Sequence, residues 1–265
     1  MRVGVIGCGG RMGRAVLREV LAARDLELAG GVERPGHPDL GRDLGLLAGE
    51  ATTGLLVRDD LAALLAAADA LIEFSTPEAS LEHARVCAAR GRPLVIGTTG
   101  FSAEQDRELS RLAERFPLLL APNMSLGVNL LLALTEEVAK ALGPDFDIEI
   151  LEMHHRQKGD APSGTALALG RAAAAGRGVR LEDAAVRVRD GITGPRPRGT
   201  IGFATLRGGD VVGDHSVIFA GEGERIVLQH LASDRRIYAR GAVAAARWLV
   251  GRPPGRYGMR DVLGL

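Results

Sequence analysis

The sequence predicts an α/β protein in two parts: a domain built on a parallel sheet, followed by an α+β domain. Up to Pro122, short apolar runs alternate with helical patterns, which is typical of repeated strand and helix units around a parallel sheet. From Ala185 the chain instead becomes a series of β runs separated by short turns. We therefore expect a change of architecture between these two residues.

The first part contains apolar runs of strand length, each bounded by turn or helix signals. We expect strands at residues 2–6, 26–32, 70–74, 93–97 and 117–121. Thr76 followed by Pro77 indicates the start of one intervening helix, and Ser102 followed by Glu104 indicates another. The order of these elements favours strands that run parallel and are connected by helices.

The second part mixes helices and strands. We expect a helix from about Gly127 to Leu142, a strand over 145–153, a helix over 163–175, β runs at 185–189, 201–207, 211–220 and 224–232, and a last helix over 235–251. The last three β runs are joined by "GGD" and "GEG", which favours antiparallel hairpins. Residues 191–200 are rich in glycine and proline, and we expect an irregular, mobile loop there.

Composition limits the classes of function. The chain has 265 residues, 46% of them hydrophobic, and 33 basic residues balance 33 acidic ones, so we expect a soluble protein without nucleic-acid partners. No run reaches the roughly eighteen apolar residues that span a membrane, and no secretion signal is visible, so we expect a cytoplasmic protein without a membrane partner. Cys8 and Cys87 have no metal-ligand spacing, and we expect neither a disulfide nor a metal site.

A glycine-rich turn follows the first expected strand. In "VGVIGCGGRMGRAV", Gly7, Gly10 and Gly13 form G-x-x-G-x-x-G rather than the common G-x-G-x-x-G. Glycines at this place permit a tight turn and let the backbone approach a pyrophosphate at the start of a helix. The spacing alone is a weak signal of dinucleotide binding.

The end of the second expected strand strengthens that signal. Glu33 follows twenty residues after Gly13, where an acidic side chain can accept hydrogen bonds from ribose hydroxyls. This position favours NAD. Arg34 comes next and could hold the 2′-phosphate of NADP, so the two neighbours leave the choice between NADH and NADPH open, and a solvated loop pair is the structural alternative.

Two later strand ends belong to the same edge of a parallel sheet. "GTTG" at 97–100 and "APNMSLGVN" at 121–129 are rich in small residues, which let the backbone approach a nicotinamide. Asn123 can offer a donor and an acceptor. Ordinary turn and cap roles remain the alternative for these residues.

The stretch "EMHHRQKGDAPSGT" at 152–165 gathers groups that transfer protons. Histidine changes its charge near neutral pH, and the ammonium group of Lys158 lies three to four residues beyond His154 and His155. Lysine is rare in this chain, where Lys140 is the only other one, and a lysine can release a proton whereas an arginine cannot. A solvated basic loop is the structural alternative.

An expected helix start follows these groups and favours an anion. Pro162 or Ser163 in the first turn would leave the backbone N–H groups of Ser163, Gly164 and Thr165 at the positive end of the helix. A carboxylate or a phosphate is the ligand that such a helix start favours. Combined with a nicotinamide site, this predicts hydride transfer to an anionic, unsaturated small molecule, with a proton from a lysine or a histidine.

These motifs resemble the dihydrodipicolinate reductase family of bacterial lysine and diaminopimelate biosynthesis. The resemblance rests on "EILEMHHRQKGDAPSGTA" (149–166), supported by "GCGGRMG", "IGTTGF", "APNMSLGVN", "GTIGFATLRGGDVVGDHS" and "GMRDVLGL", and it spans nearly the whole chain. It implies NADH- or NADPH-dependent reduction of dehydrated 4-hydroxy-tetrahydrodipicolinate to tetrahydrodipicolinate. It also implies a Rossmann-type dinucleotide-binding domain (1–124 and 235–265), and a substrate-binding and tetramerisation domain with an open mixed sheet (125–234).

The resemblance also implies roles for individual residues. His154 is the acid/base, Lys158 the proton donor, and His155, Gly164 and Thr165 bind the substrate. The implied cofactor-binding residues are Gly7, Cys8, Gly9, Gly10, Arg11, Met12, Glu33, Arg34, Gly97, Thr98, Thr99, Ala121, Pro122, Asn123 and Met124. Two other functions remain open: another NAD(P)-dependent dehydrogenase of a small anionic substrate, and a regulator that senses nicotinamide without turnover.

Overall fold

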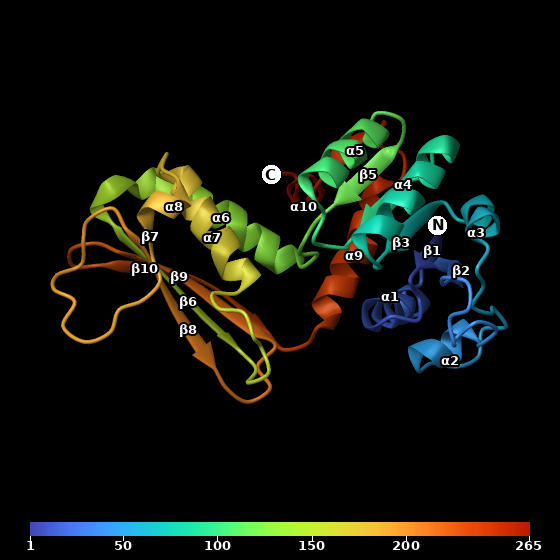
Figure 1. The fold of residues 1–265 in the computed structure, drawn as a ribbon, viewed down its shortest axis with the longest axis horizontal. Coiled ribbons are helices and arrows are strands. Elements are labelled where there is room, and N and C mark those ends of the chain that lie inside the picture. The colour runs from blue at the N-terminus through green and yellow to red at the C-terminus, as the bar shows by residue number, and fades with distance from the viewer. The chain divides into compact units, whose positions relative to one another are not determined.

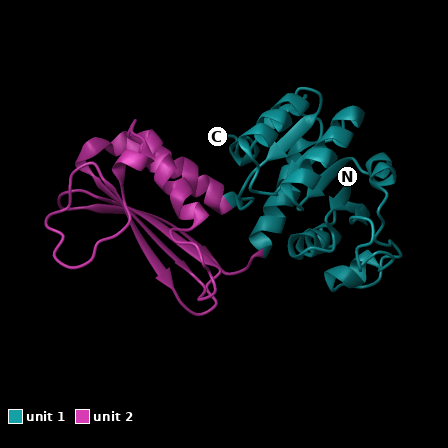
Figure 2. Cartoon of the chain, in the orientation of Figure 1, with its two compact units in different colours: residues 1–126, 236–265 teal, residues 127–235 magenta.

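The computed structural model describes residues 1–265, which form two compact units (Figure 2). Unit 1 consists of Met1–Leu126 and Arg236–Leu265, and unit 2 consists of Gly127–Arg235. The C-terminal segment thus belongs to the same unit as the N-terminus. None of the helices is both long enough and apolar enough to cross a membrane.

Unit 1 is built on a six-stranded sheet in which every pair of neighbours is parallel. The order is β11-β5-β4-β3-β1-β2. The strands are β1 (Arg2–Ile6), β2 (Glu27–Val32), β3 (Ala70–Glu73), β4 (Leu94–Ile96), β5 (Pro117–Leu120) and β11 (Gly255–Tyr257). This confirms the predicted parallel sheet, although the three-residue edge strand β11 was not expected. The chain order reverses between β1 and β3, and ligands bind at such a point in open α/β sheets.

Helices cover both faces of this sheet. They are α1 (Arg11–Ala22), α2 (Leu44–Ala48), α3 (Leu61–Ala67), α4 (Pro77–Arg90), α5 (Ala103–Ala113), α9 (Arg236–Leu249) and α10 (Met259–Leu263). Side chains of α1, α2 and α9 share one core with the sheet, while those of α3, α4 and α5 share the other. Thr76 caps α4 and Ser102 caps α5, as the start signals indicated, but the residue that completes the capping box with Ser102 is Gln105 rather than Glu104.

Unit 2 contains a five-stranded mixed sheet in the order β10-β9-β6-β8-β7. The strands are β6 (Asp147–His154), β7 (Ala185–Val186), β8 (Ile201–Arg207), β9 (Gly213–Ala220) and β10 (Arg225–Ala232). The helices are α6 (Leu126–Leu142), α7 (Gly164–Gly176) and α8 (Leu181–Ala184), with a 3-10 turn at Gly143–Asp145. Apolar side chains of α6 and α7 share a core with one face of the sheet (Figure 1).

Two expectations for this sheet were wrong. The turn after β8 does not make a hairpin, because β6 lies between β8 and β9, parallel to β8 and antiparallel to β9. A short link can step over one strand, so the link length alone did not reveal the pairing. The hairpin of β9 and β10 is confirmed. The run expected at 185–189 forms a strand only over Ala185–Val186.

The loop at 191–200 contains no helix or strand, as expected, but it is attached to β6. The guanidinium of Arg196 donates to the carboxylates of Asp147 (2.6 Å) and Glu149 (2.8 Å). Arg189 donates to both oxygens of Glu149 at 2.8 Å. Glu149 therefore holds two arginines on the sheet face opposite α6 and α7.

Candidate functional site

The glycine-rich turn joins β1 to α1 in unit 1. Gly7 has a φ of +74°, and its carbonyl accepts a hydrogen bond from the N–H of Gly10 at 3.2 Å. A Cβ atom at Gly13 would lie 2.0 Å from the Gly7 oxygen, so only glycine lets α1 pack this closely on the turn. The turn is therefore tight and packs closely on the start of α1, as expected for glycines between a strand and a helix.

A pocket of about 520 Å³ lies at the point where the strand order reverses. Gly7 and Gly10 line it from the turn after β1, and Glu33 and Arg34 line it from the end of β2. The structure adds lining residues that the sequence did not indicate for a ligand: His37, Phe74, Ser75 and Thr76, and His83 of α4. The loop residues among them carry no periodic pattern, and the helical pattern around His83 does not reveal which residue faces the pocket. The glycine turn, the acid and the helix start together fit a dinucleotide.

Glu33 and Arg34 differ in how they are held. Oε1 of Glu33 accepts a hydrogen bond from the N–H of Gly9 at 2.8 Å, so this carboxylate is fixed beside the turn. Arg34 is exposed at the pocket. This arrangement leaves room for recognition of either a ribose hydroxyl by Glu33 or a 2′-phosphate by Arg34.

The loops expected to contact the nicotinamide follow β4 and β5, and two side chains of the second loop are buried in the protein core. Ala121 and Met124 are buried in a core of unit 1, as is Cys8 of the glycine turn. Burial raises the pKa of Cys8 to about 12, so its thiol stays protonated. These three residues can therefore contact a cofactor only through their backbone. Arg11 and Met12 lie in the first turn of α1.

A buried carboxylate connects the loop after β4 to the loop after β3. Glu73 is fully buried and accepts hydrogen bonds from Thr98 (3.1 Å) and Ser80 (2.8 Å). Thr98 Oγ1 in turn accepts the N–H of Ser75 at 2.8 Å. The hydroxyl of Thr98 thus connects the loop after β4 to Glu73 and to the loop after β3. Gly97 and Thr99 are its direct neighbours in the loop after β4.

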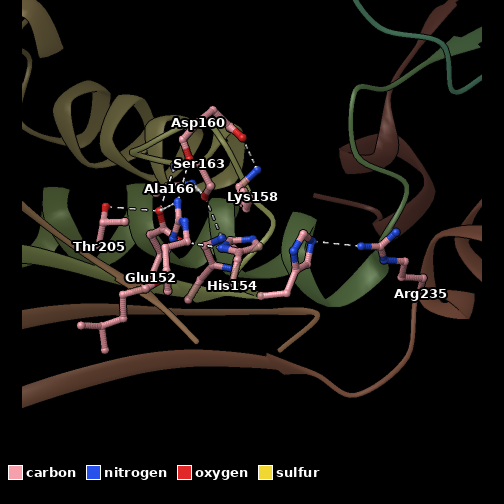
Figure 3. A network of polar contacts seen from close by, with 12 residues as sticks. Glu152, His154, Lys158, Asp160, Ser163, Ala166, Thr205 and Arg235 are labelled. Carbon is pink, nitrogen blue, oxygen red and sulfur yellow. Dashed lines mark hydrogen bonds and ion pairs between the residues drawn. The ribbon is translucent and has the colours of Figure 1, made fainter. Parts of the chain in front are cut away.

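In unit 2, the proton-transfer candidates meet around Glu152, near the end of β6 (Figure 3). Residues of β6 alternate between the two faces, so Glu152 and His154 point toward the side of the sheet that faces the helices. Glu152 is 1% exposed. Its carboxylate accepts hydrogen bonds from His154 Nδ1 (2.5 Å), the Ser163 N–H (3.0 Å) and two guanidinium nitrogens of Arg207 (2.8 and 2.9 Å).

The charges of these groups follow from their surroundings. Burial raises the pKa of Glu152, but the hydrogen bonds from Arg207, His154 and Ser163 outweigh this and hold its pKa below the usual value. Burial lowers the pKa of His154, and the nearby Lys158 and Arg207 add to this, although Glu152 opposes it. His154 is therefore neutral at pH 7, with Glu152 ionised beside it.

Lys158 lies in the loop after β6 and pairs with Asp160. Its Nζ donates to the Asp160 carboxylate at 2.7 Å, which lowers the pKa of Asp160. The Lys158 side chain is 21% exposed, whereas that of Asp160 is 61% exposed. Arg207 also donates to the backbone carbonyl of Asp160 at 2.7 Å, so the loop is fixed to β8.

Helix α7 begins at Gly164, one residue later than the expected helix over 163–175. Ser163 is its N-cap, with Oγ accepting the Ala166 N–H at 3.1 Å, and its own N–H is taken by Glu152. Ser163 N–H is thus not available to a ligand. Gly164 and Thr165 form the first turn, and nothing lies within 4 Å of a Cβ built at Gly164. An anion can approach the helix end here.

His155 has other hydrogen-bond partners than His154. Its Nε2 accepts a hydrogen bond from Arg235 at 3.1 Å, and its backbone N–H donates to the Val211 carbonyl at 2.7 Å. Arg235 follows the end of β10. Arg235 was not predicted from the sequence because arginine is abundant throughout the chain. Its place beyond a strand end was the one available signal.

Comparisons with known proteins agree over the whole chain. The family models described as "Dihydrodipicolinate reductase, N-terminus" and "Dihydrodipicolinate reductase, C-terminus" match residues 1–124 and 127–263. The chain belongs to the dihydrodipicolinate reductase family.

Several relatives in this family are similar over their full length. A 4-hydroxy-tetrahydrodipicolinate reductase of Brucella abortus (strain 2308) is 55% identical over 262 residues, with 98% of each chain covered. The enzyme of that name from Parvibaculum lavamentivorans is 56% identical over 266 residues, covering 100% of this chain and 98% of the relative.

Solved structures show the same fold. The dipicolinate-bound dihydrodipicolinate reductase of Paenisporosarcina sp. TG-14 has a TM-score of 0.79 at 26% identity, with 98% of each chain covered. GenD2 from gentamicin A biosynthesis, in complex with NAD, has a TM-score of 0.57 at 17% identity, covering 94% of this chain and 85% of that one. The second similarity concerns the fold alone.

Proposed function

We propose that this chain reduces the dehydrated form of 4-hydroxy-tetrahydrodipicolinate to tetrahydrodipicolinate, the reaction for which its relatives are named. Membership of the family makes it an NAD(P)H-dependent oxidoreductase. One observation carries the substrate assignment: Glu152 holds both the proton-transfer residue His154 and the N-cap of α7. A proton-transfer residue and the proposed carboxylate site are thereby held by the same carboxylate.

The helix end is the proposed carboxylate site. Gly164 and Thr165 present the first turn of a 13-residue helix, whose partial positive charge favours an anion. His155 and Arg235 are proposed to contact the second carboxylate, because Arg235 brings a guanidinium to His155 Nε2. The dipicolinate bound to the Paenisporosarcina enzyme is a dicarboxylate, in keeping with two anion sites.

Protonation is assigned to Lys158 and His154. A bound nicotinamide supplies the hydride, and the carbon next to the reduced position then needs a proton. The ammonium of Lys158 carries one, whereas neutral His154 has its Nδ1 proton directed at Glu152. We therefore propose Lys158 as the donor, with His154 as the acid/base.

The cofactor is proposed to bind in unit 1. Gly7 to Met12 would hold the pyrophosphate, Glu33 and Arg34 the adenosine end, and the segments Gly97–Thr99 and Ala121–Met124 the nicotinamide. Because Glu33 and Arg34 both line the pocket, NADH and NADPH are both expected to serve.

A homotetramer is proposed through the open face of the unit 2 sheet. The large apolar side chains of Leu206, Val227 and Leu231 are 47%, 53% and 59% exposed on the face away from α6 and α7. Exposed apolar residues gathered on one sheet face favour association with another copy. Val227→Glu is expected to give dimers or monomers in analytical ultracentrifugation, and an unchanged assembly would refute this surface.

A direct assay tests the function. Oxidation of NADH, followed by its loss of absorbance, is expected when freshly generated substrate is added, and NADPH should serve in parallel. Cofactor binding without turnover would instead favour a nicotinamide sensor. A dehydrogenase that uses a cysteine nucleophile is disfavoured, because burial raises the pKa values of Cys8 and Cys87 to about 12.

A further inference from the structure

We infer that Glu152 and Arg207 are positioning residues that fix His154 in the tautomer with a proton on Nδ1, so that Nε2 is the atom that exchanges a proton during the reaction. This inference rests on the proposed role of His154. It adds two residues and a defined ring nitrogen to that role, and it makes Gly213 the residue that keeps this nitrogen accessible.

Strand register places these residues side by side. Glu152 on β6 lies opposite Thr205 on β8 and His215 on β9. His154, two residues further along β6, lies opposite Arg207. Because side chains at i and i+2 share a face, Arg207 reaches diagonally back to Glu152.

The hydrogen bonds to Glu152 determine where the histidine proton lies. Each carboxylate oxygen accepts one guanidinium nitrogen of Arg207, and Oε1 also accepts the Ser163 N–H. A carboxylate with these donors stays ionised, so it can only accept from His154. At 2.5 Å, Nδ1 of His154 must therefore carry the proton that lies between the two groups.

The other edge of the His154 ring is kept accessible by a glycine. A Cβ atom at Gly213 would lie 3.0 Å from Nε2 of His154 and 3.3 Å from its Cδ2. Any side chain at this position would therefore press on Nε2. His215 packs edge-on against the ring with 5.0 Å between centroids, so His154 is held from the side as well.

The titratable groups around His154 come from three strands and one loop. Glu152 is its acidic neighbour on β6, and Arg207 and Lys158 lower its pKa from β8 and from the loop after β6. His215 on β9 is itself buried, and burial lowers its pKa to about 4, so it is neutral. Of these groups only Glu152 favours a proton on His154, and removing its charge must lower the pKa of His154 further.

The same cluster links both halves of the proposed site. Glu152 holds the N–H of Ser163 at the start of α7, and Arg207 holds the carbonyl of Asp160, the ion-pair partner of Lys158. Arg207 makes these contacts with one planar group, which lysine cannot reproduce. Glu152 and Arg207 thus position the acid/base, the lysine loop and the helix end together.

Imidazole ¹H–¹⁵N spectra of the full-length protein test the tautomer without turnover. With only six histidines, the His154 signal can be assigned by its loss in His154→Gln. We expect the proton on Nδ1 in the wild type and a shift toward Nε2–H in Glu152→Gln, because an amide provides only one acceptor oxygen. An Nε2–H tautomer in the wild type, or identical spectra of the two proteins, would overturn the inference.

Kinetics provide a second measurement. Glu152→Gln is expected to lower kcat by about 10-fold or more and to move the pH limb of His154 in kcat/KM to lower pH, with KM for NADH unchanged. Glu149→Gln is the matched control, because Glu149 also holds two arginines on β6 but on the opposite face. Its pH profile should equal that of the wild type once its assembly state has been verified. A pH limb that stays in place in Glu152→Gln refutes the positioning role.

Gly213→Ala carries the test if Glu152→Gln does not fold. It should keep the Nδ1–H tautomer in the spectra and still lower kcat by about 10-fold or more, because its methyl group covers Nε2. Unchanged kcat would show that Nε2 is not the reacting atom. If the wild type oxidises no NADH with the substrate, the proposed function fails, while the spectra still decide the tautomer.

Discussion

Replacing Lys158 by methionine tests the proposed proton donor. The Lys158 side chain is only 21% exposed, and methionine keeps most of its length while removing the ammonium. Loss of general acid catalysis is expected to lower kcat by about 10² or more, equivalent to about 2.7 kcal/mol in transition-state stabilisation. The assay is steady-state oxidation of NADH with freshly generated substrate, with kcat and KM determined separately.

A second substitution separates charge from proton donation. Lys158→Arg keeps a cation near Asp160 and near the anionic substrate, but a guanidinium does not release its proton. We expect KM for the substrate close to that of the wild type and kcat as low as in Lys158→Met. An unchanged kcat in the methionine variant, or full kcat in the arginine variant, would refute Lys158 as the donor.

Two further predictions concern the adenosine end and the stability of unit 2. Arg34→Ala should raise KM for NADPH several-fold more than KM for NADH, and Glu33→Ala should do the reverse; equal effects on both cofactors would contradict the assigned contacts. His215 has a folded pKa of about 4 against 6.5 for the free group, so the unfolded chain binds the extra proton between these values. Its contribution to stability is complete above pH 6.5 and is lost as the pH falls, by up to about 1.4 kcal/mol per pH unit. Urea unfolding at pH 7 and pH 5 should therefore show a smaller loss of stability in His215→Gln than in the wild type, and an equal loss would contradict a buried, neutral His215.

Local patterns were sufficient for much of the fold. Five of the six strands of unit 1 follow from apolar runs, and α4 and α5 begin directly after the residues whose side chains cap them. Capping and alternation depend on near neighbours in sequence. The glycine turn and Glu33 also belong to one strand, helix and strand unit, and the structure places Gly7 and Glu33 at one pocket.

Local sequence patterns could not predict contacts between segments that are distant in the sequence. The insertion of β6 between β8 and β9 depends on pairing across more than fifty residues, so the turn after β8 was misread as a hairpin. Likewise, the stretch 152–165 indicated His154 and Lys158, whereas Arg207 was not recognised, because its role depends on its cross-strand position opposite His154. The protonation of His154 depends on burial and on neighbours from β8 and β9, and these exist only once the sheet of unit 2 has formed.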